Sequence, residues 1–267
     1  MDTIRIGTLN TQNSKINRTG GITKDGIDNA EVLAKHIENN SYYFLGTQEL
    51  TRVFSGKLLN HLNDYKLYGN YRYGSSKIVK SISFLDDFNE NNAIITNKDV
   101  VKTETKLLPW FPNNPKDLID SIKHGSIMPR IITMTEVFDN NVGNVIALNT
   151  HLDYQLKSVQ TRQLKNICKI ISILIRQNPN IVLTGDFNME IKINEHFDEF
   201  VQYLNQLGLK RVGVNNKTNA EKFPNQTAID HIFIPRNWEI MNAGLINDSA
   251  LDTVTDHKGV YADIKIR

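Results

Sequence analysis

Short apolar runs bounded by polar or turn-forming residues recur along the chain and predict β-strands. We place strands near residues 4–10, 43–48, 93–96, 131–138, 144–150, 181–185, 229–234 and 259–266. Apolar residues spaced three and four apart predict helices near 27–37, 156–177 and 197–207. Because strands alternate with helices while some strands follow each other directly, we expect an α/β fold with mixed sheets.

A faint internal repeat supports this organisation. Residues 7–11 read GTLNT and residues 146–150 read IALNT, and each stretch precedes a predicted helix and then a strand that ends in an acid. These acids are Glu49 and Asp186. Two similar halves packed sheet against sheet would bring the strand ends to one rim. A match this short also arises by chance, so the duplication is a hypothesis.

Polar side chains stand at the ends of several predicted strands. The clearest case is Gly185-Asp186-Phe187-Asn188, where an apolar run ends in a carboxylate and a carboxamide two residues apart. An unpaired carboxylate is costly inside a protein, so Asp186 is expected at a polar edge or cleft. The other strand ends carry Asn10, Glu49, His151, Asp230 with His231, and Asp256 with His257. Together they indicate one functional site.

The length of 267 residues allows one large domain or two small ones. The polar strand ends run from Asn10 to His257, so both ends of the chain would contribute to one body, and we predict a single domain over 1–267. Apolar residues make up 40% of the chain and charged residues 22%, as in soluble globular proteins. The net charge of +2 permits a polyanionic substrate without indicating one.

The chain has a single cysteine, Cys168, which excludes an intramolecular disulfide. It lies among the apolar positions of a predicted helix and is expected to be a buried structural thiol. The N-terminal residues enter a strand without a signal segment, and no run reaches the roughly 18 apolar residues of a membrane span. We therefore expect a cytoplasmic protein without stable membrane association or an evident obligate protein partner, although a trimmed chain would also lack its signal.

The acids and amides at the strand ends favour a hard divalent cation, Mg²⁺ or Mn²⁺. Glu49, backed by Asn10 and a nearby aspartate, would hold an ion that keeps several waters and binds a substrate phosphate. Hydrolysis of a phosphoester also needs a group that directs water and donors for the developing charge. Asp186 could orient or deprotonate the water, which makes phosphoester hydrolysis the leading hypothesis.

The remaining strand-end residues supply the other parts of such a site. Asn188, His151 and His257 could donate hydrogen bonds to phosphoryl oxygens. Asp230 could hold one imidazole in its working tautomer. His231, next to Asp230, is expected to be structural.

Six motifs, in order, resemble those of the endonuclease/exonuclease/phosphatase superfamily, and the match covers nearly the whole chain. They are Leu9-Asn10-Thr11, Thr47-Gln48-Glu49, Asn149-Thr150-His151-Leu152-Asp153, Gly185-Asp186-Phe187-Asn188, Ile229-Asp230-His231-Ile232 and Thr255-Asp256-His257. Any one of them alone would be weak, whereas the ordered set is specific. The resemblance implies a four-layer α/β sandwich in which two packed mixed β-sheets are flanked by helices.

The resemblance also implies roles for individual residues. Glu49 would be the main metal ligand, with Asn10 beside it and Asp256 near the metal. Asp186 would activate or orient water and Asn188 would steady the phosphate. His257, paired with Asp230, would contact the scissile phosphate, and His151 would be the second histidine on the phosphate side.

Two further matches are looser and lie on the substrate side. Glu90, in Asn89-Glu90-Asn91-Asn92, resembles the acid that orients the other histidine in pancreatic-type deoxyribonuclease. Arg130, in Met128-Pro129-Arg130, resembles an arginine of the phosphate-side wall. Phe88 stands where some nucleases of the superfamily have a tyrosine near the phosphate, so that contact is not implied.

The sequence thus predicts a Mg²⁺-dependent phosphoesterase acting on a phosphodiester, with a nuclease or nucleotide phosphodiesterase as the leading hypothesis. Alternatives are a sphingomyelinase-like phospholipid phosphodiesterase, a phosphomonoesterase and an inactive binding protein on the same fold. Nucleic acid is a candidate substrate. Substrate choice is expected to lie in the long loops 66–92 and 108–130, the second with a short helix at 115–124.

Overall fold

The computed structural model describes residues 3–73, 88–108, 128–215, 218 and 228–266. In this part of the chain the strands form two six-stranded sheets. The first has the order β11 (Glu239–Leu245), β12 (Val260–Lys265), β1 (Thr3–Asn10), β2 (Tyr42–Gln48), β4 (Ile94–Thr96) and β3 (Lys66–Tyr68). Only β1 and β2 run parallel, and the other neighbours are antiparallel.

The second sheet repeats this arrangement. Its order is β5 (Asp99–Leu108), β6 (Arg130–Asp139), β7 (Gly143–His151), β8 (Ile181–Asp186), β10 (Asp230–Pro235) and β9 (Leu209–Arg211). Again one central pair, β7 and β8, is parallel and the others are antiparallel. Strand β1 therefore corresponds to β7 and β2 to β8, which is the correspondence that the GTLNT and IALNT stretches suggested.

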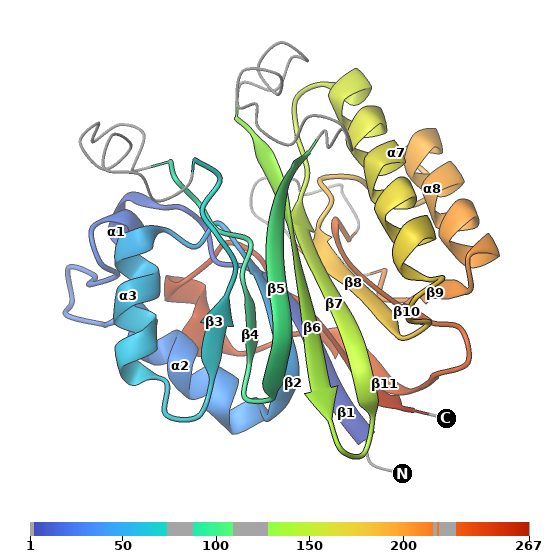
Figure 1. The fold of residues 1–267 in the computed structure, drawn as a ribbon. Helices are drawn as coiled ribbons and strands as arrows, with labels where there is room; N and C mark the ends of the chain where they lie inside the picture. Colours follow the sequence, from blue (N-terminus) through green and yellow to red (C-terminus); the bar gives the residue numbers. More distant parts are fainter. Residues whose placement is uncertain (1–2, 74–87, 109–127, 216–217, 219–227, 267) are drawn as a thin grey trace.

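Helices cover the outer face of each sheet (Figure 1). On the first sheet lie α2 (Asn29–Asn40) and α3 (Arg52–His61), with α1 (Lys15–Arg18) and the 3₁₀ helix η1 (Ser249–Thr253) nearby. On the second lie α7 (Lys157–Leu174) and α8 (Glu195–Gln206). Asp28 begins α2 by accepting a hydrogen bond from the Ala30 N–H, and Asn194 caps α8 in the same way.

Three apolar clusters fill the spaces between the layers. One joins α2 and α3 to the first sheet, and another joins α7 and α8 to the second. The third lies between the sheets and contains Ile6 and Phe44 from the first sheet and Val145, Val182 and Ile232 from the second. The layers are therefore helix, sheet, sheet, helix, and the predicted four-layer α/β sandwich is confirmed.

Each predicted strand is present, and so is each helix predicted within the described residues, but α1, α3, η1, β3, β5, β9 and β11 were not predicted. Strand β5 is an edge strand with exposed charged residues, and β3 and β9 are three residues long, so none of these has a clear apolar run. Cys168 is partly exposed rather than fully buried. The helix expected at 115–124 lies outside the described residues. None of the described helices is long and apolar enough to cross a membrane.

Candidate functional site

Alternate residues on the central strands face the opposite sheet, as the period of two in a β-strand requires. These series are Ile4-Ile6-Thr8-Asn10 on β1, Phe44-Gly46-Gln48 on β2, Val145-Ala147-Asn149-His151 on β7, Val182-Thr184-Asp186 on β8 and Ile234-Ile232-Asp230 on β10. Each series starts in the apolar cluster between the sheets. Those on β1, β7 and β8 continue through buried polar residues and end in a candidate site residue.

The buried polar residues form a network that joins the two sheets beneath the site. Gln48 Nε2 donates to Asn149 Oδ1 (2.6 Å) and to Thr8 Oγ1 (3.1 Å), and Thr184 Oγ1 donates to the same Asn149 oxygen (3.2 Å). Asn149 Nδ2 donates to two backbone carbonyls of the first sheet, both at 2.8 Å. All four side chains are fully buried. The network therefore fixes the two sheets relative to each other. It lies one or two residues before the strand ends that carry the site.

Gly46 permits this close approach of the sheets. A Cβ at this position would lie 2.3 Å from Thr184 Oγ1 and 2.7 Å from Asn149 Oδ1. Both distances are far below ordinary van der Waals contact, so any side chain at this position would push the sheets apart.

Asn10 connects the acid of the first sheet to the acid of the second. Its Nδ2 donates to Glu49 Oε1 and to Asp186 Oδ2, both at 3.0 Å. The other oxygen of Glu49 accepts from the Asn13 N–H at 2.6 Å. Asn10 Oδ1 accepts from the Gln12 N–H at 2.9 Å. Asn10 thus lies beside Glu49 and links the two carboxylates through its Nδ2, while its role as a metal ligand stays a prediction.

His257 and Asp230 form the predicted pair. His257 Nδ1 lies 2.9 Å from Asp230 Oδ2, and His257 Nε2 lies 3.8 Å from Asp186 Oδ2. The backbone of His257 is held by Thr255, whose hydroxyl accepts from the His257 N–H and donates to the Asn10 carbonyl. The C-terminal motif is thereby attached to the end of β1.

The charges in this cluster shift one another. Burial and the nearby charge of Asp230 raise the pKa of Asp186 to about 7. Burial alone would lower the pKa of His257, but the charge and hydrogen bond of Asp230 outweigh it and raise the pKa to about 10. At neutral pH His257 is therefore an imidazolium that is hydrogen-bonded to Asp230. The neighbouring Asp186 has a pKa close to this pH, so it can gain or lose a proton.

His151 ends β7 between the two acids that Asn10 links. Its Nδ1 lies 3.8 Å from Glu49 Oε1 and its Nε2 lies 3.7 Å from Asp186 Oδ2. Burial, reinforced by the positive charges of Arg130 and Arg72, holds the pKa of His151 well below its ordinary value. His151 is therefore a neutral imidazole, which donates from one nitrogen and accepts at the other.

Two site residues have left-handed backbone conformations. Glu49 has φ 62° and Asn188 has φ 51°, each just after the end of a strand. Asparagine tolerates this region, whereas glutamate rarely adopts it, and such residues cluster at functional sites. The Asn188 N–H donates to Asp186 Oδ1 (2.9 Å), and its side-chain Nδ2 donates to the Leu152 carbonyl (2.9 Å). Asn188 thus holds Asp186 in place from the backbone.

The expected contact of Glu90 with His151 is wrong. Glu90 accepts from Asn13 Nδ2 at 2.8 Å and forms an ion pair with Arg72, while His151 Nδ1 has no hydrogen-bond partner in the described part of the chain. The physical reason is that Arg72 carries a full charge in a buried position and competes better for the carboxylate than a neutral imidazole. Arg72 itself was not among the predicted site residues.

Asp186, Asp230 and His257 form a buried cluster in which one ligand atom from each lies within 4.8 Å of the others, and it could hold a metal ion once His257 has lost a ring proton. This set differs from the predicted one of Glu49, Asn10 and Asp256. Asp256 borders it, with its Oδ1 4.0 Å from His257 Nε2. Asp230 Oδ1 is buried without a hydrogen-bond partner among the described residues. A buried carboxylate oxygen without a hydrogen-bond donor, close to other carboxylates, is a suitable ligand for a hard divalent cation.

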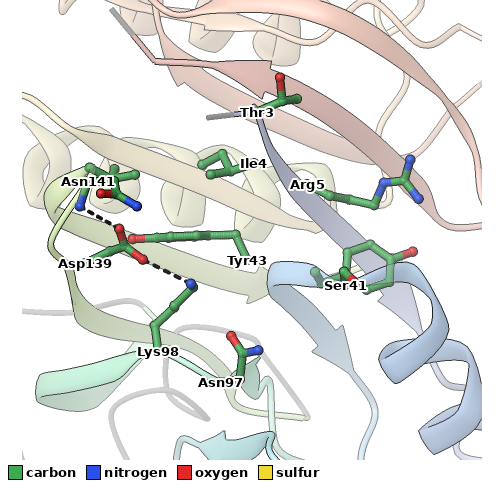
Figure 2. Close-up of a pocket in the computed structure, with 11 residues that line it drawn as sticks. Thr3, Ile4, Arg5, Ser41, Tyr43, Asn97, Lys98, Asp139 and Asn141 are labelled. Carbon is green, nitrogen blue, oxygen red and sulfur yellow. Dashed lines mark hydrogen bonds and ion pairs between the residues drawn. The ribbon is translucent and has the colours of Figure 1, made fainter. Parts of the chain in front are cut away.

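A hollow lies at the end of β1 and β2 opposite to the candidate site (Figure 2). It measures about 240 Å³ and is lined by the first residues of these strands. Its charged groups pair with each other, Lys98 with Asp139 at 3.0 Å and Arg5 with Asp263 at 2.7 Å. Its lining contains one acid, Asp139, and no histidine, so this hollow lacks the cluster of acids and histidines found at the strand ends.

No protein-family model and no curated protein matches the sequence. Solved structures do match the fold. A mannosyl-6-phosphatase from Bacteroides thetaiotaomicron is 20% identical with a TM-score of 0.76, over 98% of this chain and 100% of that one. An endonuclease/exonuclease/phosphatase from Bacteroides vulgatus is 18% identical with a TM-score of 0.78, over 100% of both chains.

TDP2 from D. rerio, complexed with a single-strand DNA product, is 15% identical with a TM-score of 0.68, over 100% of both chains. The chain therefore has the fold of the endonuclease/exonuclease/phosphatase superfamily.

Proposed function

We propose that this protein is a metal-dependent phosphoesterase, and that its substrate is a phosphodiester of a nucleic acid or nucleotide. One observation carries the proposal. The hydrogen bonds of Asn10 join Glu49 of one sheet to Asp186 of the other, beside the His257–Asp230 pair. Acids, a charged imidazole and a neutral imidazole thus meet at one place, as the hydrolysis of a phosphoester requires.

Each group has a chemical task in this proposal. Asp186, with a pKa near neutrality, orients the attacking water and accepts its proton. His257, as an imidazolium, donates from Nε2 to a phosphoryl oxygen, and Asp230 keeps that proton on the ring. His151 and Asn188 lie on either side of the same phosphate. The backbone N–H of Asn188 also holds the Asp186 carboxylate in place.

The donor set supports a divalent cation, which we propose to be Mg²⁺ or Mn²⁺. Glu49, Asp256 and the cluster around Asp186 supply the carboxylate oxygens that would hold it. When bound, the ion would polarise the phosphoryl group and offset its negative charge. Asn10, which in this structure donates to two of these acids, would keep them in position around the ion.

A phosphomonoester is the second candidate substrate, because one protein of the same fold is a mannosyl-6-phosphatase. The structure of TDP2 with a single-strand DNA product favours a nucleic-acid ester instead. A sphingomyelinase-like activity has no comparable support among these neighbours. An inactive binding protein is disfavoured because Glu49, Asp186 and His257 are all present and meet at one place.

The test is hydrolysis of bis-p-nitrophenyl phosphate and p-nitrophenyl phosphate with Mg²⁺, with Mn²⁺ and with a chelator. We expect turnover that the chelator abolishes and that Asp186→Asn lowers at least about a hundredfold, the scale of losing a general base. Asp64→Asn, at an exposed aspartate just before β3, is the matched control and should retain full activity. Turnover that survives both the chelator and Asp186→Asn would contradict the proposal.

A further inference from the structure

Two buried arginines at one side of the site have N–H groups without partners. Arg72 and Arg130 are 6% and 4% exposed. Arg72 forms an ion pair with Glu90, but its Nε and Nη1 have no hydrogen-bond partner among the described residues. In the same part of the chain, the side chain of Arg130 forms no ion pair or hydrogen bond. Since a buried N–H group without an acceptor is unfavourable, these groups indicate that an anion binds there.

Strand register shows where Arg130 lies relative to the acids. It begins β6, beside the end of β7, where His151 is found. His151 pairs in register with Asp186 on β8, and Asp186 pairs with Asp230 on β10. Along this edge of the second sheet the order is therefore a cation, an imidazole and two acids. Arg130 stands at the end opposite to Asp230.

Arg72 follows β3 of the first sheet, and its backbone N–H donates to the Glu90 carbonyl (3.0 Å). Asn13 connects the two regions, because its side chain donates to Glu90 (2.8 Å) and its backbone N–H donates to Glu49 (2.6 Å). Arg72 is thus linked to Glu49 through Glu90 and Asn13. Burial and then the charge of Arg130 lower the pKa of Arg72 to about 9. The same segment contacts the start of β6, because Asn92 Nδ2 donates to the carbonyl of Ile131, next to Arg130 (2.9 Å). One anion between the two arginines would therefore relieve their mutual repulsion.

We propose that Arg72 and Arg130 form a second anion subsite, which binds a phosphate next to the ester that is cleaved. The inference rests on the proposed function and specifies its substrate as a phosphodiester with a neighbouring phosphate, such as a short oligonucleotide with a phosphorylated end. Planar guanidinium groups match the oxygens of phosphate. Neighbouring strands lie about 4.8 Å apart, so Arg130 and Asp186, two strands apart, have backbones separated by roughly 10 Å. That separation suits two successive phosphates better than one.

The experiment compares a thymidine dinucleotide with the same dinucleotide carrying a 5′- or a 3′-terminal phosphate. For each protein the measured quantity is the ratio of kcat/KM for a phosphorylated substrate to that for the plain one. This ratio does not depend on the folded fraction of the preparation. We expect the unmodified protein to prefer one phosphorylated form, and Arg72→Gln and Arg130→Gln each to reduce that preference roughly 10- to 100-fold.

Two further variants sharpen the test. Arg72→Lys keeps the charge and should recover part of the preference. Arg236→Gln, an exposed arginine after β10, is the matched control and should keep the preference in full. Equal kcat/KM for all three dinucleotides, or a preference that survives both Arg72→Gln and Arg130→Gln, would overturn the subsite.

A failure of the proposed function gives a different result, namely no metal-dependent hydrolysis of any dinucleotide. The subsite is then tested by calorimetric binding of inorganic pyrophosphate to the unmodified protein and to Arg72→Gln. Weaker binding by the variant supports the subsite, and equal affinity overturns it.

Discussion

Replacing Asp230 with asparagine tests the electrostatic effect of the Asp230 charge on His257. The two side chains are 2.9 Å apart, and the carboxylate is buried, so its charge acts on the imidazole with little screening. An asparagine has nearly the same shape and can still accept from Nδ1. Asp230→Asn therefore removes the charge while keeping the hydrogen bond.

The size of the effect follows from the shifted pKa values. The pKa of His257 is raised to about 10, whereas an ordinary histidine has a value of about 6.5. Asp186 and Asp256 still raise the pKa of His257 in the variant, so we expect a pKa of ~7. The difference of ~3 corresponds to a loss on the order of 4 kcal/mol in the interaction that favours the imidazolium. At pH 8 the imidazolium fraction would fall from nearly all to about one tenth.

The variant should also alter the other side of the pH profile. The charge of Asp230 contributes to the raised pKa of Asp186, so its removal lowers that pKa. Activity needs Asp186 deprotonated and His257 protonated. Both limbs of the profile therefore move to lower pH, and kcat/KM should fall roughly tenfold at pH 8 but should not fall at pH 6, where more of Asp186 is deprotonated than in the unmodified protein.

The assay is the pH dependence of kcat/KM at saturating metal, for the unmodified protein, Asp230→Asn and the control Asp64→Asn. NMR titration of the His257 ring, assigned with His257→Gln, measures its pKa directly. A loss of activity that is equal at all pH values would refute the electrostatic reasoning. A sharply raised metal requirement with an unmoved basic limb would instead show that His257 and Asp230 bind the cation themselves.

The other predictions concern metal binding and stability. Glu49→Gln should raise the metal concentration for half-maximal activity at least about tenfold, and an unchanged metal titration would exclude Glu49 as a ligand. Thr184→Val removes the hydroxyl that bonds to Asn149 and should lower the free energy of unfolding by roughly 1–3 kcal/mol in urea, whereas no loss would mean that water replaces it. Burial lowers the pKa of His231 to about 4, so the neutral form is favoured in the folded state and stability is lost as pH falls from about 6.5 to about 4. Unfolding of His231→Gln should therefore lack about 3 kcal/mol of this acid-induced loss, and identical pH dependence would contradict the assignment.

Much of the fold was accessible from the sequence because local spacing records which face of a strand is buried. The series Val182-Thr184-Asp186 and Val145-Ala147-Asn149-His151 change from apolar to polar toward the end of each strand, and that change marks the rim of the sheet. Elements without an apolar run escaped this reasoning, as the edge strand β5 did, because solvent faces much of it.

The contacts within the site depended on the tertiary structure. Asn10 and Asp186 are 176 positions apart, and no spacing rule predicts that one amide would donate to both Glu49 and Asp186. Arg72 lies in the segment 66–92, which was expected to be a long loop, and no local pattern in it predicts that Glu90 pairs with Arg72 rather than with His151. These hydrogen bonds and ion pairs depend on which groups compete for one partner, and the competing groups come together only when the sheets pack.

The sequence by itself therefore determined the order of strands and helices, the polar strand ends and the residue types that meet there, because these follow from periodicity and side-chain chemistry. The tertiary structure alone decided which oxygen faces which donor, which histidine is charged and where two buried arginines have N–H groups without an acceptor among the described residues. These properties depend on distance and burial, and both are set by how the two sheets lie against each other.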